Sequence, residues 1–244
     1  MQSIAVFNFK GGSLKTTSTQ SIGAALAMQG KKVLLIDMDA QHNLTQIFNV
    51  EIESSVYDAL SEKKPLEPIE VGENLFLAGN ELSMIKMEME LTNVLREREY
   101  ILRNCIDPIR ADFDYILIDC PPSLGLVTIN ALLASEDTKI IVPVEPEFLG
   151  LKGFVVLTEA LQNIGLKIEG LFCSKFDRRK VIHRRIKQQL EKHFKEIMFK
   201  SSIRTNVSGT EAQAAHKTIF EYAPNSNSAK DYQKLTKEII QRFK

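Results

Sequence analysis

Short apolar runs alternate along the chain with longer segments in which apolar residues recur every three or four positions. The runs predict strands at residues 4–7, 32–36, 74–78, 115–118, 138–144 and 166–174. The periodic segments predict helices near residues 16–28, 56–61, 81–105, 149–163 and 181–194. Within residues 81–105 the apolar stripe consists of Met84, Met87, Leu91, Val94 and Leu95. Strands that alternate with helices indicate an α/β protein with a mainly parallel sheet and helices on both faces.

Length and composition fit one large domain over residues 1–244. The 244 residues suffice for a single buried core, and we find no internal repeat or low-complexity linker. The stretch through Pro65 and Pro68 is rich in turn residues. The three cysteines are odd in number and form no CxxC pair, which favours buried thiols in a reducing compartment. No apolar run has the length of a membrane span or the flanks of a signal peptide. We therefore expect a cytoplasmic protein.

The first predicted strand runs directly into a glycine-containing loop that opens a helix. Backbone N–H groups in such a loop and at a helix start converge on one point, where a phosphate can bind. Lys15 is placed to reach the phosphates of a nucleotide, and the Thr16 hydroxyl to ligate Mg²⁺. The expected nucleotide-binding residues are Lys10, Gly11, Gly12, Ser13, Leu14, Lys15, Thr16 and Thr17.

Leu14 departs from the general phosphate-loop pattern, which has Gly immediately before the lysine. Gly is favoured where the loop needs a positive φ or a close approach of backbone to phosphate. A Leu in that conformation costs on the order of 1–3 kcal/mol. We therefore expect a loop that closes less easily and slow hydrolysis. A loop that no longer binds phosphate is the alternative.

Two further predicted strands end in acidic residues. The strand at 32–36 is followed by Asp37 and Asp39, and the strand at 115–118 by Asp119. Ligands of doubly wound parallel sheets bind outside the carboxyl ends of the strands, so these acids are expected beside the phosphates. An acid there can hold Mg²⁺ or orient a water for attack on the γ-phosphate.

These motifs resemble those of the ParA/MinD-type ATPases with a deviant Walker A motif. The family loop KGGxxK[ST] corresponds to residues 10–16, its Asp-x-Asp motif to residues 37–39, and its Asp-x-Pro-Pro strand end to residues 119–122. The similarity continues through residues 123–125, 128–131 and 141–147, as far as Asn206-Val207 and Glu211-Ala212, and it is greatest to the ParA (Soj-like) branch. The resemblance implies a doubly wound phosphate-loop NTPase fold. Because the loop begins at Lys10, we expect no amino-terminal helix-turn-helix domain of the kind that some relatives carry.

The resemblance also implies roles for particular residues. Lys10 would be the signature lysine that crosses to the partner's nucleotide in an ATP-sandwich dimer. Lys15 would bind the phosphates, and Asp39 would activate or orient the attacking water. Thr16 and Asp119, with Asp37 in support, would hold Mg²⁺, and ATP would be the substrate. Adenine specificity rests on the resemblance alone, since residues 174–177 could read the base or form an ordinary turn.

The net charge of zero conceals a basic segment. Residues 175–204 contain 11 Lys or Arg and 3 Asp or Glu, a net of +8, so the rest of the chain carries −8. Such a cluster suits phosphate contacts to DNA without sequence readout. The ParA branch uses an arginine after its Asn-Val pair, where this chain has Ser208. We therefore expect the DNA contacts to be Arg178, Arg179, Lys180, Arg184, Arg185, Lys187 and Arg204. A solvated helix face is the alternative.

The family implies a homodimer with ATP, nonspecific DNA and a ParB-like centromere-binding activator as partners, in plasmid or chromosome partitioning. The ATP-bound form would be associated with the nucleoid. Two other functions stay open. Residues 229–244 carry Tyr232, Leu235, Ile239, Ile240 and Phe243 on one face, which could serve a MinD-like, membrane-associated ATPase. Leu14 could also indicate a nucleotide-bound scaffold with little hydrolysis.

Overall fold

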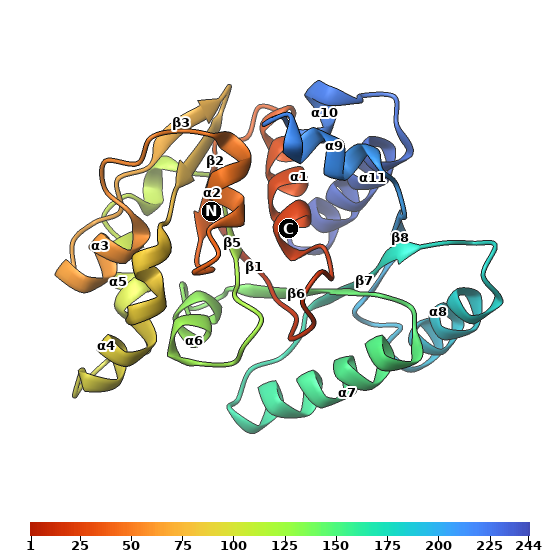
Figure 1. The fold of residues 1–244 in the computed structure, drawn as a ribbon. Helices are drawn as coiled ribbons and strands as arrows, with labels where there is room; N and C mark the ends of the chain where they lie inside the picture. The colour runs from red at the N-terminus through yellow and green to blue at the C-terminus, as the bar shows by residue number, and fades with distance from the viewer.

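A single eight-stranded sheet forms the centre of the molecule in the computed structural model, which describes residues 1–244 (Figure 1). The strand order is β3-β4-β2-β5-β1-β6-β7-β8, and only the β3–β4 pair is antiparallel. The strands are β1 (Gln2–Val6), β2 (Val33–Asp37), β3 (Ile69–Gly72), β4 (Leu75–Ala78), β5 (Tyr115–Asp119), β6 (Lys139–Val144), β7 (Gly170–Phe176) and β8 (Met198–Arg204). The sequence prediction of a mainly parallel sheet is confirmed.

Helices cover both faces of this sheet, as expected. They are α1 (Lys15–Ala27), α2 (Asn43–Phe48), α3 (Val56–Glu62), α4 (Met87–Asn93), α5 (Ile101–Ile106), α6 (Leu126–Leu132), α7 (Phe148–Asn163), α8 (Val181–His193), α9 (Ser208–Ala214), α10 (Ile219–Tyr222) and α11 (Asn227–Arg242), with 3₁₀ helices η1 (Leu82–Lys86) and η2 (Arg110–Asp112).

Alternating strand residues supply two separate cores. Leu34, Ile116 and Val142 face a core formed with helices α3 to α8. Leu35, Leu117 and Ile141 face a core formed with α1 and the carboxy-terminal helices. Because strand residues are apolar on both faces, the strands read as continuous apolar runs in the sequence.

The long helix predicted over residues 81–105 is wrong. The segment forms η1 and α4, leaves the helix at Val94 in an extended conformation, and starts again as α5. Glu97 between them has a φ of +56°, which a continuing helix does not allow. Met84, Met87 and Leu91 of the predicted stripe are buried, whereas Leu95 is 97% exposed. The stripe therefore ends where the helix ends.

The strands β3 and β8 at the two edges of the sheet have no counterpart among the predicted elements. In β3 the residues alternate between half-buried and exposed, and the strand follows the turn-rich stretch through Pro65 and Pro68. In β8 polar residues interrupt the apolar pattern. Edge strands are only partly covered, which explains why their sequences lack a continuous apolar run.

Candidate nucleotide site

The loop between β1 and α1 is a tight connection that contains two residues in the left-handed backbone conformation. Asn8 shapes its start, because the side chain accepts a hydrogen bond from the backbone N–H of Lys10 (3.0 Å) and donates one to Pro143 O (2.7 Å). Gly12 and Leu14 both have a positive φ, of 70° and 73°. Leu14 is the residue before α1, so the backbone does require the left-handed conformation where the general pattern has Gly. The Leu14 side chain is half-buried and packs against the core beside α1.

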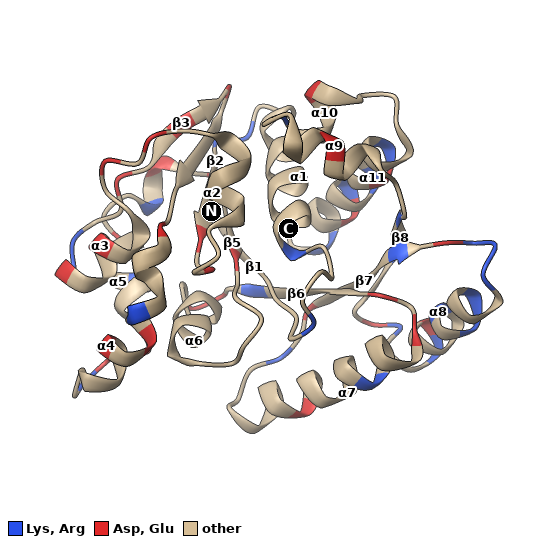
Figure 2. Cartoon of the chain, viewed as in Figure 1, with Lys and Arg blue, Asp and Glu red and all other residues tan.

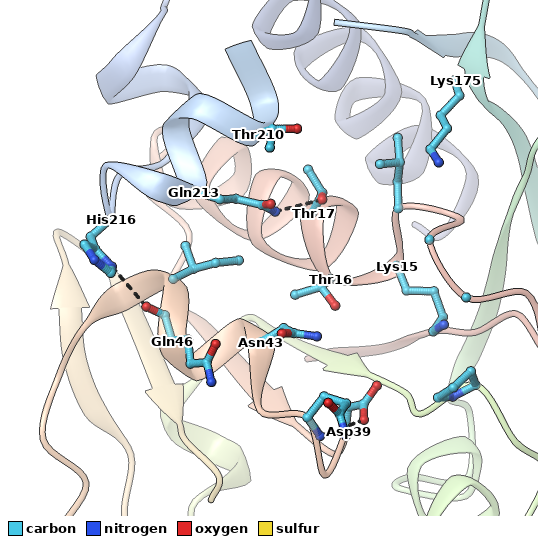
Figure 3. Close-up of a pocket in the computed structure, with 16 residues that line it drawn as sticks. Lys15, Thr16, Thr17, Asp39, Asn43, Gln46, Lys175, Thr210, Gln213 and His216 are labelled. Carbon is cyan, nitrogen blue, oxygen red and sulfur yellow. Dashed lines mark hydrogen bonds between the residues drawn. The ribbon is translucent and has the colours of Figure 1, made fainter. Parts of the chain in front are cut away.

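Lys15 and Thr16 at the start of α1 point into a pocket of about 720 Å³ (Figure 3). Lys15 is 7% exposed, so its ammonium group is held among protein atoms at the place where phosphates would bind. The Thr16 hydroxyl donates a hydrogen bond of 2.6 Å to Asp119 Oδ2. The other carboxylate oxygen of Asp119 is buried and has no partner. Hydroxyl and carboxylate oxygens are the ligands that Mg²⁺ prefers, so the pair fits this cation.

Asp37 and Asp119 lie side by side, because the register of β2 and β5 pairs these two residues. Asp37 Oδ2 accepts hydrogen bonds from the backbone N–H (2.9 Å) and the hydroxyl (2.8 Å) of Thr45, and Oδ1 accepts one from Asp39 N (3.2 Å). Burial nevertheless raises the pKa of Asp37 to about 6. Burial, and next the charge of Asp37, also raise the pKa of Asp119. A divalent cation would offset both costs.

Asp39, the candidate for orienting the attacking water, is half-buried and lines the pocket. Its Oδ1 accepts a hydrogen bond of 3.0 Å from the backbone N–H of Gln41, which fixes the carboxylate at the pocket edge. Pro122, from the segment after β5, lines the same pocket. The pocket thus contains the phosphate loop and the candidate for activating water.

Helices α2 and α9 form the other walls of the pocket. Of their residues, only Glu211-Ala212 of α9 belongs to the family resemblance. Asn43 and Gln46 come from α2, whereas Thr210 and Gln213 come from α9 (Figure 3). Gln213 Nε2 donates a hydrogen bond of 2.8 Å to Thr17 Oγ1. The remaining lining residues that sequence reasoning missed are Gln41, Ile47 and His216. These polar residues lie in ordinary helical or turn sequence, so only the fold reveals them.

His216 joins the two walls, because its Nδ1 donates a hydrogen bond of 3.1 Å to the backbone oxygen of Gln46. Lys175 reaches the pocket from the end of β7 (Figure 3). Its backbone has a φ of +50°, and its ammonium group lies beside Gly12. Of residues 174–177, which the sequence offered as base-reading or turn residues, Lys175 is the one that lines the pocket.

Lys10 does not line the pocket of its own chain. Its ammonium group forms an ion pair and hydrogen bond with Glu145 at the end of β6. Its Nζ atom also lies 3.8 Å from a carboxylate oxygen of Glu147. The side chain remains 38% exposed. The free chain therefore holds Lys10 at the surface between two carboxylates.

The basic residues gather at the β7–α8 connection, along α8 and at the end of β8 (Figure 2). Some already have structural partners. Arg204 makes a bidentate contact with the buried Asp231, at 2.7 and 2.8 Å. Lys187 donates to Lys200 O (3.3 Å) and Ser202 Oγ (3.0 Å). These contacts join the end of β8 to α11 and α8.

Arg179 and Arg184 shape the turn before α8. Arg179 pairs with Asp177 (2.9 Å), and this contact holds the pKa of Asp177 at about 2. Arg184 donates to the backbone oxygen of Arg178 (2.6 Å). Arg178, Lys180 and Arg185 are exposed, and none of them takes part in an ion pair of the structure.

The eight-stranded, mainly parallel sheet with helices on both faces is that of the phosphate-loop NTPase fold class. The family model described as an AAA domain matches residues 1–171. The chain is 36% identical to the sporulation initiation inhibitor protein Soj of Bacillus subtilis, over 97% of each chain. It is 31% identical to the chromosome-partitioning ATPase Soj of Treponema pallidum, over 99% of this chain and 98% of that one. The chain therefore belongs to the ParA/Soj family of partitioning ATPases.

A solved structure agrees with the ligands that the site fits. The cobyrinic acid a,c-diamide synthase of Mycobacterium smegmatis with bound ADP and magnesium superposes with a TM-score of 0.82 at 28% identity, covering 100% of this chain and 96% of that one. The same protein with an ATP analogue and magnesium gives the same values. ATP and Mg²⁺ are consistent with the pocket described here. None of the helices has the length and apolar character needed to cross a membrane.

Proposed function

We propose that the protein is a slow ATP hydrolase that dimerises around ATP, binds DNA without sequence preference and drives partitioning of a plasmid or chromosome. The observation that carries this proposal is the position of Lys10. Lys10 does not line the pocket of its own chain and lies at the surface. A group that acts on a partner's nucleotide would have this position. A positive charge supplied across an interface acts on phosphate oxygens as an arginine finger does.

Each residue at the pocket has a defined part in the proposed hydrolysis. Lys15 binds the phosphates, and Thr16 and Asp119 hold the metal ion, with Asp37 behind them. When bound, Mg²⁺ would neutralise charge that develops on the phosphates. Asp39 orients the attacking water, and Pro122 lies where a change at the γ-phosphate can displace the segment after β5. The strained Leu14 supports slow turnover.

Exposed apolar side chains near Lys10 support a dimer. Glu147, which neighbours Lys10, directly precedes α7, and the first two residues of that helix are Phe148 and Leu149. Their side chains are 72% and 71% exposed. Val181 and Ile182 at the start of α8 are about half exposed. Apolar groups left in water are typical of a surface that a second molecule covers.

For DNA we propose Arg178, Lys180 and Arg185 as the principal phosphate contacts, because their charges are exposed and have no acidic partner. Arg179, Arg184 and Lys187 then position the surface and add to its potential. Arg204 contributes chiefly by fixing the end of β8 against Asp231. Ser208 in place of the family's arginine makes this surface the main source of positive charge.

The membrane alternative depends on the apolar face of α11. Tyr232, Leu235 and Ile239 are fully buried, and Phe243 is 7% exposed. They pack in the core that α11 forms with the sheet and α1. A helix that already uses its apolar face in this way cannot insert that face into a membrane without leaving the fold. This favours DNA over membrane as the surface that the protein binds.

The decisive test reverses charge on the proposed surface. In Arg178→Glu/Arg185→Glu we expect DNA binding with ATP to be lost while ATP binding is retained. The matched control is Lys234→Glu/Lys237→Glu, which makes the same charge change at exposed positions of α11. Each lost phosphate contact makes the slope of log K against log [salt] shallower by about 0.9. Any DNA binding that the variant retains should therefore be less sensitive to salt. Equal DNA binding by the two variants would reject this surface.

A further inference from the structure

His183 is a buried histidine on an otherwise basic and exposed part of α8. His183 is 2% exposed, whereas the next two residues, Arg184 and Arg185, are exposed. Its Nδ1 accepts a hydrogen bond of 3.1 Å from the backbone N–H of Asp177. Nδ1 therefore carries no proton, and the neutral ring holds its proton on Nε2. Nε2 is buried and has no hydrogen-bond partner.

The ring contacts the turn that carries the basic residues, and the charges of the acids that hold Lys10 act on it. Burial, and next the charge of Lys180, lower the pKa of His183. Glu147, Asp177 and Glu145 oppose this change, so their carboxylates are near enough to favour a charged ring. The two glutamates come from the β6–α7 connection, and α7 packs against the end of α8 through Phe154 and Phe194, whose ring centroids are 4.9 Å apart. Glu145 and Glu147 are the neighbours of Lys10 as well.

We propose that His183 is a positioning residue that links the departure of Lys10 from Glu145 and Glu147 to the shape of the DNA-binding turn. The inference rests on the proposed function, because it assumes that Lys10 moves to a partner's nucleotide. While Lys10 stays, its ammonium group neutralises the glutamates and His183 remains neutral. When Lys10 leaves, the glutamates attract a proton from solvent to Nδ1.

Protonation changes what the ring can bind. A ring protonated on both nitrogens is only a donor, so Nδ1 can no longer accept the N–H of Asp177. The hydrogen bond that fixes the start of the turn 177–180 is lost. The turn carries the exposed residues Arg178 and Lys180, whose backbone can then shift so that both side chains reach phosphates. The imidazolium also adds a positive charge beneath this surface. ATP-driven dimerisation would in this way strengthen DNA binding.

The linkage must work in both directions. If a proton on His183 accompanies DNA binding, then acidification strengthens that binding, by at most about tenfold per pH unit for one proton. The groups that face the ring and shape this response are Lys180 and Asp177 at the start of α8, and Glu145 and Glu147 before α7. Histidine is the side chain that titrates in the range in which this response would appear.

The first experiment measures the affinity for a nonspecific DNA duplex between about pH 6 and about pH 8, with Mg²⁺ and a non-hydrolysable ATP analogue. We expect the affinity of the wild type to fall as the pH rises. His183→Gln should lose most of this pH dependence, because a glutamine oxygen can still accept the Asp177 N–H but the side chain cannot be protonated. The matched control is His193→Gln, at an exposed histidine in the last turn of the same helix. A His183→Gln variant that titrates like the wild type overturns the proposal.

The second experiment uses no DNA. The imidazole of His183 is titrated by NMR in the nucleotide-free wild type and in Lys10→Ala. Because the variant lacks the ammonium group that neutralises Glu145 and Glu147, we expect the pKa of His183 to be higher in Lys10→Ala. Identical titrations would refute the link even in a protein that binds DNA. Conversely, a wild type that binds no DNA would reject the proposed function, while this titration would still test the coupling between Lys10 and His183.

Discussion

Replacement of Asp37 by Asn should stabilise the nucleotide-free protein. Asp37 is fully buried beside Asp119, and its pKa is raised from 3.8 to about 6. A group whose pKa is raised on folding is harder to ionise in the folded chain than in the unfolded one. The free-energy cost of ionising Asp37 in the folded chain grows as the pH rises from about 3.8 to about 6, because the unfolded chain loses its proton first. Above that range the cost is constant.

The size of the effect follows from the pKa and the hydrogen bonds. A rise from 3.8 to about 6 corresponds to about 3 kcal/mol at neutral pH. An asparagine oxygen can accept both hydrogen bonds from Thr45, but its amide group then faces the N–H of Asp39. The lost bond costs about 1 kcal/mol, which leaves a net gain of about 2 kcal/mol. For a chain of this size, that gain raises the Tm by about 4–8 °C.

Thermal unfolding in the presence of a chelator measures this difference. We expect Asp37→Asn to unfold at a higher temperature than the wild type at a pH above about 6, and the difference to shrink as the pH falls toward 4. Asp39→Asn is the matched control, because Asp39 is half-exposed and should affect the Tm little. A Tm for Asp37→Asn that equals or falls below that of the wild type at neutral pH would refute the reasoning.

Addition of Mg²⁺ and ATP should raise the Tm of the wild type and of Asp37→Asn by different amounts. The cation offsets the repulsion between the two buried acids in the wild type, whereas Asp37→Asn has less charge to neutralise. The rise in Tm on addition of the ligand should therefore be larger for the wild type. Equal rises would show that the metal ion does not act on Asp37.

Two further predictions concern the phosphate loop. Leu14→Gly removes the strain of a φ of +73° and also the contacts of a half-buried side chain, so we expect little change in Tm. We expect a faster basal ATPase, measured by phosphate release. Unchanged hydrolysis and an unchanged dimer lifetime would make Leu14 a neutral substitution. Lys10→Ala should still bind ATP, because Lys10 does not line its own pocket, but should fail to dimerise with ATP in size-exclusion chromatography; a dimer of normal size would contradict the assignment of Lys10.

The phosphate loop and the strands beneath it are predictable from sequence because both carry dense local information. Gly12, Lys15 and Thr16 have specific backbone or ligand requirements, and the central strands are apolar on both faces. The positions of Asp37 and Asp119 follow from the same reasoning, since parallel strands end at one edge of the sheet.

The walls of the pocket were not predictable in the same way. Gln46 and Gln213 lie 167 positions apart and meet the pocket only because α2 and α9 pack on either side of α1. The failure at residues 81–105 has a different cause. Apolar spacing identified the buried residues Met84 and Leu91, but it could not show that the helix is interrupted before Glu97, which has a left-handed backbone conformation. Periodicity reports which side chains are buried more reliably than how far a helix continues.

The free chain keeps several charges in arrangements that nucleotide would alter. Two adjacent carboxylates are buried at the ends of β2 and β5, and Lys10 is paired with Glu145 and Glu147. In the proposed mechanism, binding of Mg²⁺ with ATP would offset the repulsion between the two buried carboxylates. A partner's phosphates would compete with the glutamates for Lys10. In that mechanism the first change occurs within one chain and the second needs two, so nucleotide binding would precede dimerisation. Lys10→Ala should separate these steps, with nucleotide binding retained and dimerisation lost.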